Sequence, residues 1–415
     1  MKDMKEMATM FLPATTRQPD TVAKPGSSYN LAVGYLRAFV TVLVLAHHAV
    51  LAYHPLVPSA TASLVTQPRW WQAFPVVDRH RWTGFAWFVG FNDVFFMALM
   101  FFLSGLFVWK SLERKGSAGF LRDRVLRLGL PFVVAAALVA PLAYYPAYLL
   151  TGTSTGLDGF WQQWRSLGNW PAGPAWFVWV LLVFDCIAAV ALVLVPNWGR
   201  SLGRGFAGAS RRPAVFFVLL VAISMLAYVP LALVYGPLAW FGFGPFSFQL
   251  SRPLHYLVYF IMGIGVGAYG LERGLLAPEG KLARRSILWC VGALLAFAAA
   301  TTIAIASFSA KGSPQIWGTI GGIGFTVSCA ASSFAFLAVF VRFAKTRNRV
   351  WDSLRDNAYG MYLIHYAFVS WLQYALLKTA LPAVAKGSVV FLGTLALSWS
   401  ATAALRRIPA VARMV

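Results

Sequence analysis

Residues 31–55 read LAVGYLRAFVTVLVLAHHAVLAYHP, and this stretch determines the fold. It is long enough and apolar enough to cross a bilayer as a helix. It nevertheless contains Arg37, His47 and His48. A charge inside a membrane segment costs about 2.5–3.5 kcal/mol on insertion scales, so such residues indicate a functional site. We therefore expect a membrane helix that carries part of the site.

The spacing of these residues places two of them on one helix face. Arg37 and His48 are eleven residues apart. At roughly 100° per residue they lie within about 20° of the same face and roughly 16 Å apart along the axis. His47 falls about 80° away. A fixed cation at one depth and an imidazole further on would suit a transport pathway, or an active site reached from both sides.

The composition identifies the class of protein. The chain has 415 residues, of which 59% are hydrophobic and only 12% are charged, and its mean hydropathy is +0.66. Soluble domains are closer to half apolar and a quarter charged. We therefore expect an all-α polytopic membrane protein. The three cysteines lie in apolar stretches too far apart for a metal motif, so we expect buried core thiols and no catalytic metal.

Ten apolar runs of about 20 residues are long enough to be membrane spans. They lie near 31–52, 86–108, 129–150, 175–195, 214–235, 252–270, 286–307, 317–341, 357–377 and 387–405. With a cytoplasmic N-terminus, 26 of the 35 Lys and Arg residues fall in inner segments and 7 in outer loops. This positive-inside pattern places both termini in the cytoplasm. It also explains the net charge of +22 without a nucleic-acid partner.

These spans define the expected domain organisation. We expect a cytoplasmic tail at 1–28 with no signal peptide, a ten-helix membrane domain at 29–406, and a short cytoplasmic tail at 407–415. Two outer loops, 53–85 and 151–174, are rich in tryptophan. Their rings would serve as stacking platforms for sugars or as the aromatic belt of any membrane protein. These tryptophans are Trp70, Trp71, Trp82, Trp161, Trp164 and Trp170. We expect the uncharged loop 236–250 to lie at the membrane surface.

A basic segment follows the second span. Ser104 and Gly105 permit close helix packing there. Arg124 and Arg127 are three residues apart and should face the same way on a helix. Paired guanidinium groups suit phosphate oxygens, although positive-inside anchoring explains the same residues.

Other polar residues lie within or at the edges of spans. Asp185 would be a counter-ion for Arg37 or a polar link between helices. Arg252 and His255 share a face at an outer boundary, and His365 lies near the middle of the ninth span. A histidine in such a position serves either a site or a hydrogen bond between helices.

The order of these motifs resembles the membrane acyltransferase-3 family, especially the branch that contains glucan biosynthesis protein C. Arg37 and His48 match the family's arginine–histidine pair. FFLSG, a basic loop and the Arg124–Arg127 pair follow. PAWFVWVLL at the fourth span and NAYGMYLIH, which ends at His365, complete the match.

The resemblance implies an O-acyltransferase of the bacterial inner membrane. It would transfer an acetyl or succinyl group from cytoplasmic acyl-CoA to a hydroxyl of an extracytoplasmic carbohydrate. His48 resembles the essential histidine, Arg37 its partner, and Arg124 and Arg127 the arginines that hold coenzyme A phosphates. We expect no C-terminal hydrolase-like domain of the SGNH type, so the membrane domain or a separate partner would complete the transfer.

Two mechanisms and one other function remain open at this point. His48 would act as a general base or as a covalent acyl carrier. The alternative function is a proton-coupled exporter or flippase of a lipid-linked glycan, with Arg37, His48 and Asp185 as a proton relay.

Overall fold

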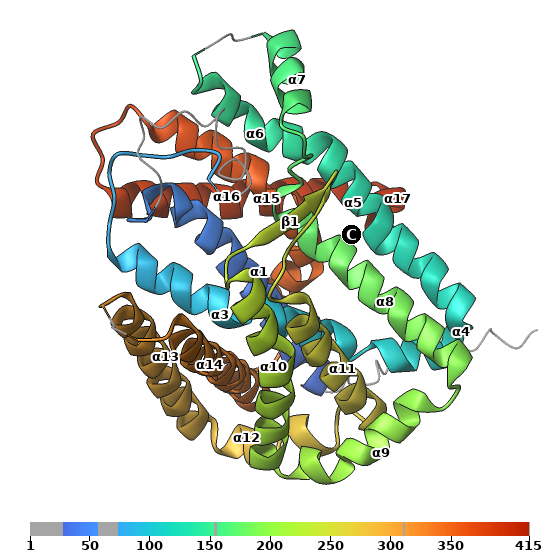
Figure 1. Ribbon diagram of the computed structural model, residues 1–415. Coiled ribbons are helices and arrows are strands. Elements are labelled where there is room, and N and C mark those ends of the chain that lie inside the picture. The colour runs from blue at the N-terminus through green and yellow to red at the C-terminus, as the bar shows by residue number, and fades with distance from the viewer. Residues whose placement is uncertain (1–27, 57–73, 153–155, 310–311, 415) are drawn as a thin grey trace, which may run out of the picture.

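The computed structural model describes residues 28–56, 74–152, 156–309 and 312–414. The expected N-terminal tail up to residue 27 lies outside the described residues, as do Trp70 and Trp71. Within this part, each of the ten apolar runs forms most or all of a long helix (Figure 1).

The first half of the chain contains helices broken by short turns. They are α1 (Ser28–Val50), η1 (Leu51–Tyr53), α3 (Gly84–Gly105), α4 (Val108–Arg124), η3 (Val125–Gly129), α5 (Leu130–Val134), η4 (Ala135–Val139), α6 (Ala140–Leu149), α7 (Leu157–Ser166), η5 (Gly173–Ala175), α8 (Trp176–Leu194) and α9 (Trp198–Arg211). Helix α4 is kinked at Gly116, and from there to the end of α6 the chain forms one continuous rod, with π-helical turns at η3 and η4.

The second half begins with a helix and a small hairpin. Its elements are α10 (Pro213–Tyr235), β1 (Trp240–Phe243), β2 (Phe246–Gln249), α11 (Pro253–Tyr269), η6 (Gly274–Leu276), α12 (Lys281–Arg284), α13 (Ser286–Ser309), α14 (Pro314–Phe343), α15 (Arg349–Leu376), α16 (Ala383–Leu405) and α17 (Pro409–Met414).

These helices are those of a polytopic membrane protein. Among the described residues, eight helical segments are long and apolar enough to cross a bilayer, and α11 with the bent segment after it makes a ninth. Helix α15 carries four charged residues near its start, which lowers its hydropathy. Helix α7 lies at one end of the bundle, and α9 and α12 lie at the other (Figure 1). We call these ends the α7 end and the α9 end.

Glycines allow α3 and α11 to cross closely. A β-carbon on Gly105 would lie 2.2 Å from the carbonyl oxygen of Phe260. One on Gly267 would lie 1.9 Å from the carbonyl oxygen of Leu106. Only glycine fits such contacts, which is the usual role of small residues between membrane helices. The close packing predicted at Ser104 and Gly105 is therefore confirmed.

The segment expected as a loop at 236–250 contains an antiparallel hairpin instead. Strand β1 pairs with β2 from Trp240–Gln249 to Phe243–Phe246. The turn contains Gly244, whose φ of +52° favours glycine. Its carbonyl accepts a hydrogen bond from the backbone N–H of Trp170. The hairpin is thereby joined to the segment between α7 and α8.

Candidate active site

Helix α1 lies inside the bundle, where it packs against α3, α14, α15 and α16. Its polar residues therefore face other helices of the protein. Its C-terminal end is held by Gln373 on α15, whose amide nitrogen donates to the carbonyls of His48 and Ala49 at 3.0 and 3.1 Å. The last carbonyls of a helix lack partners within it, so this buried amide fixes the position of His48.

His48 faces α15 and meets a second histidine there. The rings of His48 and His365 lie 5.0 Å apart, and Nδ1 of His48 is 3.3 Å from Nε2 of His365. The ring of Tyr366 lies 5.3 Å from His48, edge to face. The structure thus brings together two residues that the sequence separates by 317 positions.

The hydrogen bonds assign the protons of both rings. Nδ1 of His365 is 2.6 Å from the carbonyl oxygen of Tyr362, and a carbonyl only accepts, so this nitrogen carries the proton. Nε2 of neutral His365 is then an acceptor. By the same argument Nδ1 of His48, 2.8 Å from the carbonyl of Val44, is a donor that is shared with His365. The lone pair of neutral His48 therefore lies on Nε2, where it is available as a base or nucleophile.

His47 has different surroundings from its neighbour. Its ring packs 5.1 Å from that of Phe96 on α3, and the residue is only 8% exposed. Its Nδ1 is buried and has no hydrogen-bond partner in the described structure. His48 is the more accessible of the two. The geometry agrees with the sequence in favouring His48.

Arg37 lies nearer the start of α1, and it is exposed although α1 lies inside the bundle. Within the described part of the chain, its guanidinium forms no ion pair. The charged groups that act on it are Arg355, Asp356 and Arg124. A guanidinium that is accessible and lacks a counter-ion is suited to bind an anion.

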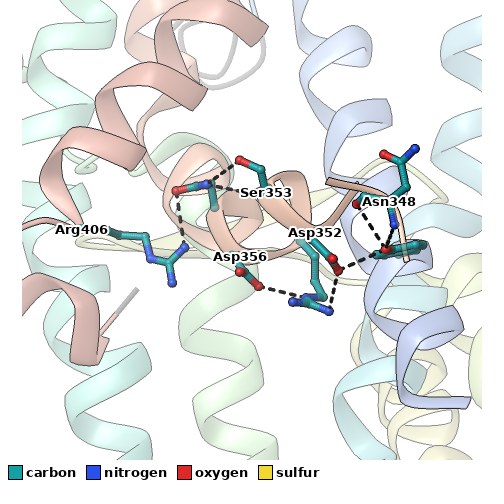
Figure 2. A network of polar contacts seen from close by, with 8 residues as sticks. Asn348, Asp352, Ser353, Asp356 and Arg406 are labelled. Carbon is teal, nitrogen blue, oxygen red and sulfur yellow. Dashed lines mark hydrogen bonds and ion pairs between the residues drawn. The ribbon is translucent and has the colours of Figure 1, made fainter. Parts of the chain in front are cut away.

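Arg355 is a site residue that the sequence reasoning missed. Its side chain packs over Gly34, where an added β-carbon would lie 2.7 Å from its Cδ. It forms ion pairs with Asp352 at 3.1 Å and with Asp356 at 2.9 Å. Asp352 also accepts from the hydroxyl of Tyr35 on α1. Figure 2 shows this network around Asp352 and Asp356, which joins the start of α15 to α1.

The network continues to the end of α16. The guanidinium of Arg406 lies 3.5 Å from the amide oxygen of Asn357, and the amide of Asn357 donates to the carbonyl of Ser353 (Figure 2). Trp399 also donates to the hydroxyl of Ser353. The charged first turns of α15 are thus held on two sides, by α1 and by α16.

Arg124 and Arg127 differ in their surroundings. Arg124 forms an ion pair at 3.1 Å with Asp185, which is 1% exposed. Asp185 therefore links α8 to the rod formed by α4 to α6, and it does not pair with Arg37. Arg127 lies in the π-helical turn η3 and is exposed. Its carbonyl accepts from the hydroxyl of Tyr359 at 2.7 Å. Helical π turns occur often at functional sites.

His255 belongs to a separate polar cluster between α11 and α14. Its Nε2 lies 3.5 Å from the sulfur of Cys329. Arg252 forms an ion pair with Asp93, and its guanidinium lies 5.1 Å from the centre of the Phe325 ring. Among the described residues, this cluster forms no direct hydrogen bond or ion pair with His48 or His365, and it is linked to His365 only through a series of aromatic ring contacts.

The tryptophans of the two predicted outer loops differ in their exposure. Trp82 and Trp161 are 48% and 37% exposed. Trp164 is buried, and Trp170 donates to the carbonyl of Ala136 at 2.8 Å. Trp164 contacts the ring of Tyr144, which contacts Tyr366 beside His48. A series of ring contacts therefore runs from α7 to the histidine pair.

The comparisons with known proteins place this arrangement in a family. The family model described as an acyltransferase domain matches residues 30–403, which is almost the whole chain. No curated protein and no solved structure matches the chain. The matched region contains the histidine pair, Arg37 and the arginines of η3 and α4. The chain belongs to the membrane acyltransferase-3 family, and it is a multi-pass membrane acyltransferase.

Proposed function

We propose that this protein transfers an acetyl or succinyl group from cytoplasmic acyl-CoA to a hydroxyl of an extracytoplasmic glycan. In this proposal the chain crosses a bacterial inner membrane ten times, with both termini in the cytoplasm. The α9 end is then cytoplasmic and the α7 end is outside. The positive-inside distribution of Lys and Arg supports this orientation.

The observation that carries the proposal is the hydrogen-bond pattern of His48. Its Nδ1–H is shared by the carbonyl of Val44 and Nε2 of His365, so its own Nε2 holds the lone pair. A general base needs a positioned lone pair and a partner that stabilises the cation formed when the base takes a proton. His365 supplies that partner, and His48 is accessible enough to meet a substrate.

The donor is proposed to bind on the arginines nearer the α9 end. Arg37 and Arg127 are exposed, and Arg124 is partly exposed beside Asp185. Guanidinium groups bind phosphate oxygens through paired, charge-assisted hydrogen bonds, and coenzyme A carries several phosphates. Arg37 lies eleven residues before His48, which is roughly 16 Å of helix. The pantetheine arm would cross that distance to bring the thioester to His48.

In direct transfer, the acceptor hydroxyl attacks the thioester with His48 as general base. Nε2 of His48 removes the proton from the acceptor hydroxyl while the oxygen attacks the thioester carbonyl. The carbon–oxygen bond forms, the carbon–sulfur bond breaks, and the coenzyme A thiolate leaves. The thiolate takes the proton from the His48 imidazolium, which restores the neutral ring. A cationic or hydrogen-bonding group beside His48 would stabilise the oxyanion of the tetrahedral intermediate.

A relay through an acyl-histidine uses the same nitrogen. Nε2 of His48 would attack the thioester carbonyl and release the thiolate. The acceptor oxygen would then take the acyl group from the imidazole while its proton passes to the thiolate, which leaves neutral His48. The exporter alternative has less support, because its proton relay needed Asp185 beside Arg37. Asp185 instead pairs with Arg124.

The test measures donor binding and transfer separately in proteoliposomes. Labelled acetyl-CoA or succinyl-CoA is added on one side, and glucan oligosaccharides are supplied on the other. We expect saturable binding of at least one donor and an ester product that hydroxylamine cleaves. Arg127→Gln should weaken binding, whereas Arg165→Gln, an exposed arginine on α7, should not. Failure of the wild-type protein to bind either donor would overturn the proposal.

A further inference from the structure

An apolar groove opens between α8, α9 and α11 at the α9 end of the bundle. Its volume is about 490 Å³, within the usual range for ligand sites. It is lined by side chains of α8, α9 and α11 and by Val195, which follows α8; among them are Ile187, Ala191, Trp198, Ser201 and Phe260. Apart from the hydroxyl of Ser201 and the indole nitrogen of Trp198, these side chains carry no polar atoms. The groove shares no residue with the His48–His365 site.

Helix α9, which borders the groove, has the character of a membrane-surface helix. Gly203 is buried against the backbone at Tyr269, and Phe206 packs over Gly265 on α11. The helix also carries Arg200, Arg204 and Arg211, all exposed, and contains no acidic residue. Amphipathic helices of this composition lie in the plane of the bilayer surface and attract anionic lipids.

Arg204 is the cation nearest the groove that lacks a counter-ion in the described structure. Arg200 is already paired with Glu113 at 2.7 Å. Arg204 instead donates to the hydroxyl of Ser201 at 3.4 Å, and Ser201 lines the groove. Arg204 thus places a positive charge, with no acidic partner among the described residues, beside the apolar groove. This is the pattern that a lipid with an anionic headgroup and a long acyl chain complements.

On the α8 side the groove is bordered by surface that faces lipid. Ile187 and Val195 line it and are 46% and 56% exposed, and Val190 and Leu194 beside them on α8 are 54% and 74% exposed. An acyl chain therefore has a continuous apolar path from the bilayer into the groove. Moving methylene groups from water into the groove is favourable, but moving them there from lipid gains little. Selective retention must therefore come from the headgroup.

We propose that this groove binds one acyl chain of an anionic glycerophospholipid of the adjacent leaflet, with its phosphate on Arg204. The site is independent of the acyl-transfer reaction and would hold α8, α9 and α11 together. A phospholipid fits this site because the groove opens toward the apolar flank of α8 and Arg204 lies on a helix of the membrane-surface type.

The test uses the full-length protein, stripped of lipid in mild detergent and titrated with phosphatidylglycerol or phosphatidylcholine of the same chains. Native mass spectrometry counts the bound lipids. The wild-type protein should retain phosphatidylglycerol roughly five-fold better than phosphatidylcholine, as expected for one cation facing a headgroup of net negative charge, because the choline ammonium cancels the phosphate charge of phosphatidylcholine. Arg204→Gln should remove this preference. Arg347→Gln, an exposed arginine outside α9, should keep it.

A second variant tests the groove itself. Ala191→Phe places a ring in the channel and should abolish retention of both lipids, whereas Leu294→Phe on the exposed side of α13 should not. A preference for phosphatidylglycerol that survives Arg204→Gln would overturn the headgroup assignment. Retention that survives Ala191→Phe in a monodisperse protein would overturn the groove assignment. Equal retention of both lipids by the wild type would overturn the proposal as a whole.

Discussion

Replacement of His365 by phenylalanine should slow acyl transfer without weakening donor binding. The variant keeps a ring of similar size but removes the acceptor that lies 3.3 Å from Nδ1 of His48. When Nε2 of His48 takes a proton, the Nδ1–H bond to His365 becomes charge-assisted. That gain exists only after proton transfer has begun, so it stabilises the transition state rather than the bound ground state.

The magnitude follows from the two acceptors of this proton. A hydrogen bond to a charged group contributes about 1.5–3 kcal/mol, which corresponds to roughly 10- to 150-fold in rate. The carbonyl of Val44 accepts the same proton at 2.8 Å and remains in the variant. We therefore expect a loss in the lower part of this range, roughly 10- to 50-fold in kcat.

The assay compares single-turnover acyl transfer with donor affinity for the wild type, His365→Phe and His365→Gln. The glutamine oxygen can accept in place of Nε2, so this variant should keep most of the activity. His365→Phe should bind acyl-CoA as the wild type does. A His365→Phe protein that transfers within two-fold of the wild-type rate would refute the reasoning. Equal losses in both variants, with unchanged melting temperature, would assign His365 a packing role instead.

Three further variants test other parts of the structure. Arg37→Gln should weaken acyl-CoA binding roughly 10- to 150-fold, because the accessible guanidinium has no counter-ion in the described part of the chain and is free to bind an anion. Arg37→Lys should lose less affinity, and equal affinity of wild type and Arg37→Gln in equilibrium binding would contradict this. Lys386→Met should destabilise the protein by about 3 kcal/mol, since the buried Asp78 carboxylate loses its lysine and keeps only its bonds to His80, and adding Asp78→Asn should recover part of the loss; an unchanged thermal melt would count against it. Gly267→Val should lower the melting temperature, because a β-carbon there would lie 1.9 Å from the carbonyl oxygen of Leu106. Gly292→Val should not, because a β-carbon on Gly292 meets no atom within 4 Å. Equal melting temperatures of the two variants would argue against the close crossing of α3 and α11.

The sequence predicted the parts of the fold that depend on local patterns. Long apolar runs predicted where the helices lie, because a chain in lipid must satisfy its backbone groups internally. Helical periodicity predicted that Arg37 and His48 share a face and that His47 does not. The structure agrees for the two histidines, since His47 faces Phe96 on α3 and His48 faces His365 on α15.

The remaining features depend on contacts between distant segments. The buried pair of Lys386 with Asp78 joins residues 308 positions apart, and no local pattern indicates it. The partner of Asp185 depends on how α8 is rotated against α4, which spacing alone does not specify. The β1–β2 hairpin has only four residues in each strand, and its first strand lacks the polar–apolar alternation of an exposed strand, so its sequence resembled a loop. Arg355 was detectable only as a charge at the start of a span.

The central claim is that His48 carries the chemistry, and the most direct test compares His48→Ala with His47→Ala. Both purified variants are supplied with labelled acyl-CoA and acceptor, after donor binding and melting temperature have been checked. The account predicts that His48→Ala binds the donor but loses transfer by at least roughly 100-fold, the smaller end of general-base contributions. His47→Ala should retain most of the activity. Transfer by His48→Ala at the wild-type rate would contradict both the general-base and the acyl-histidine mechanisms.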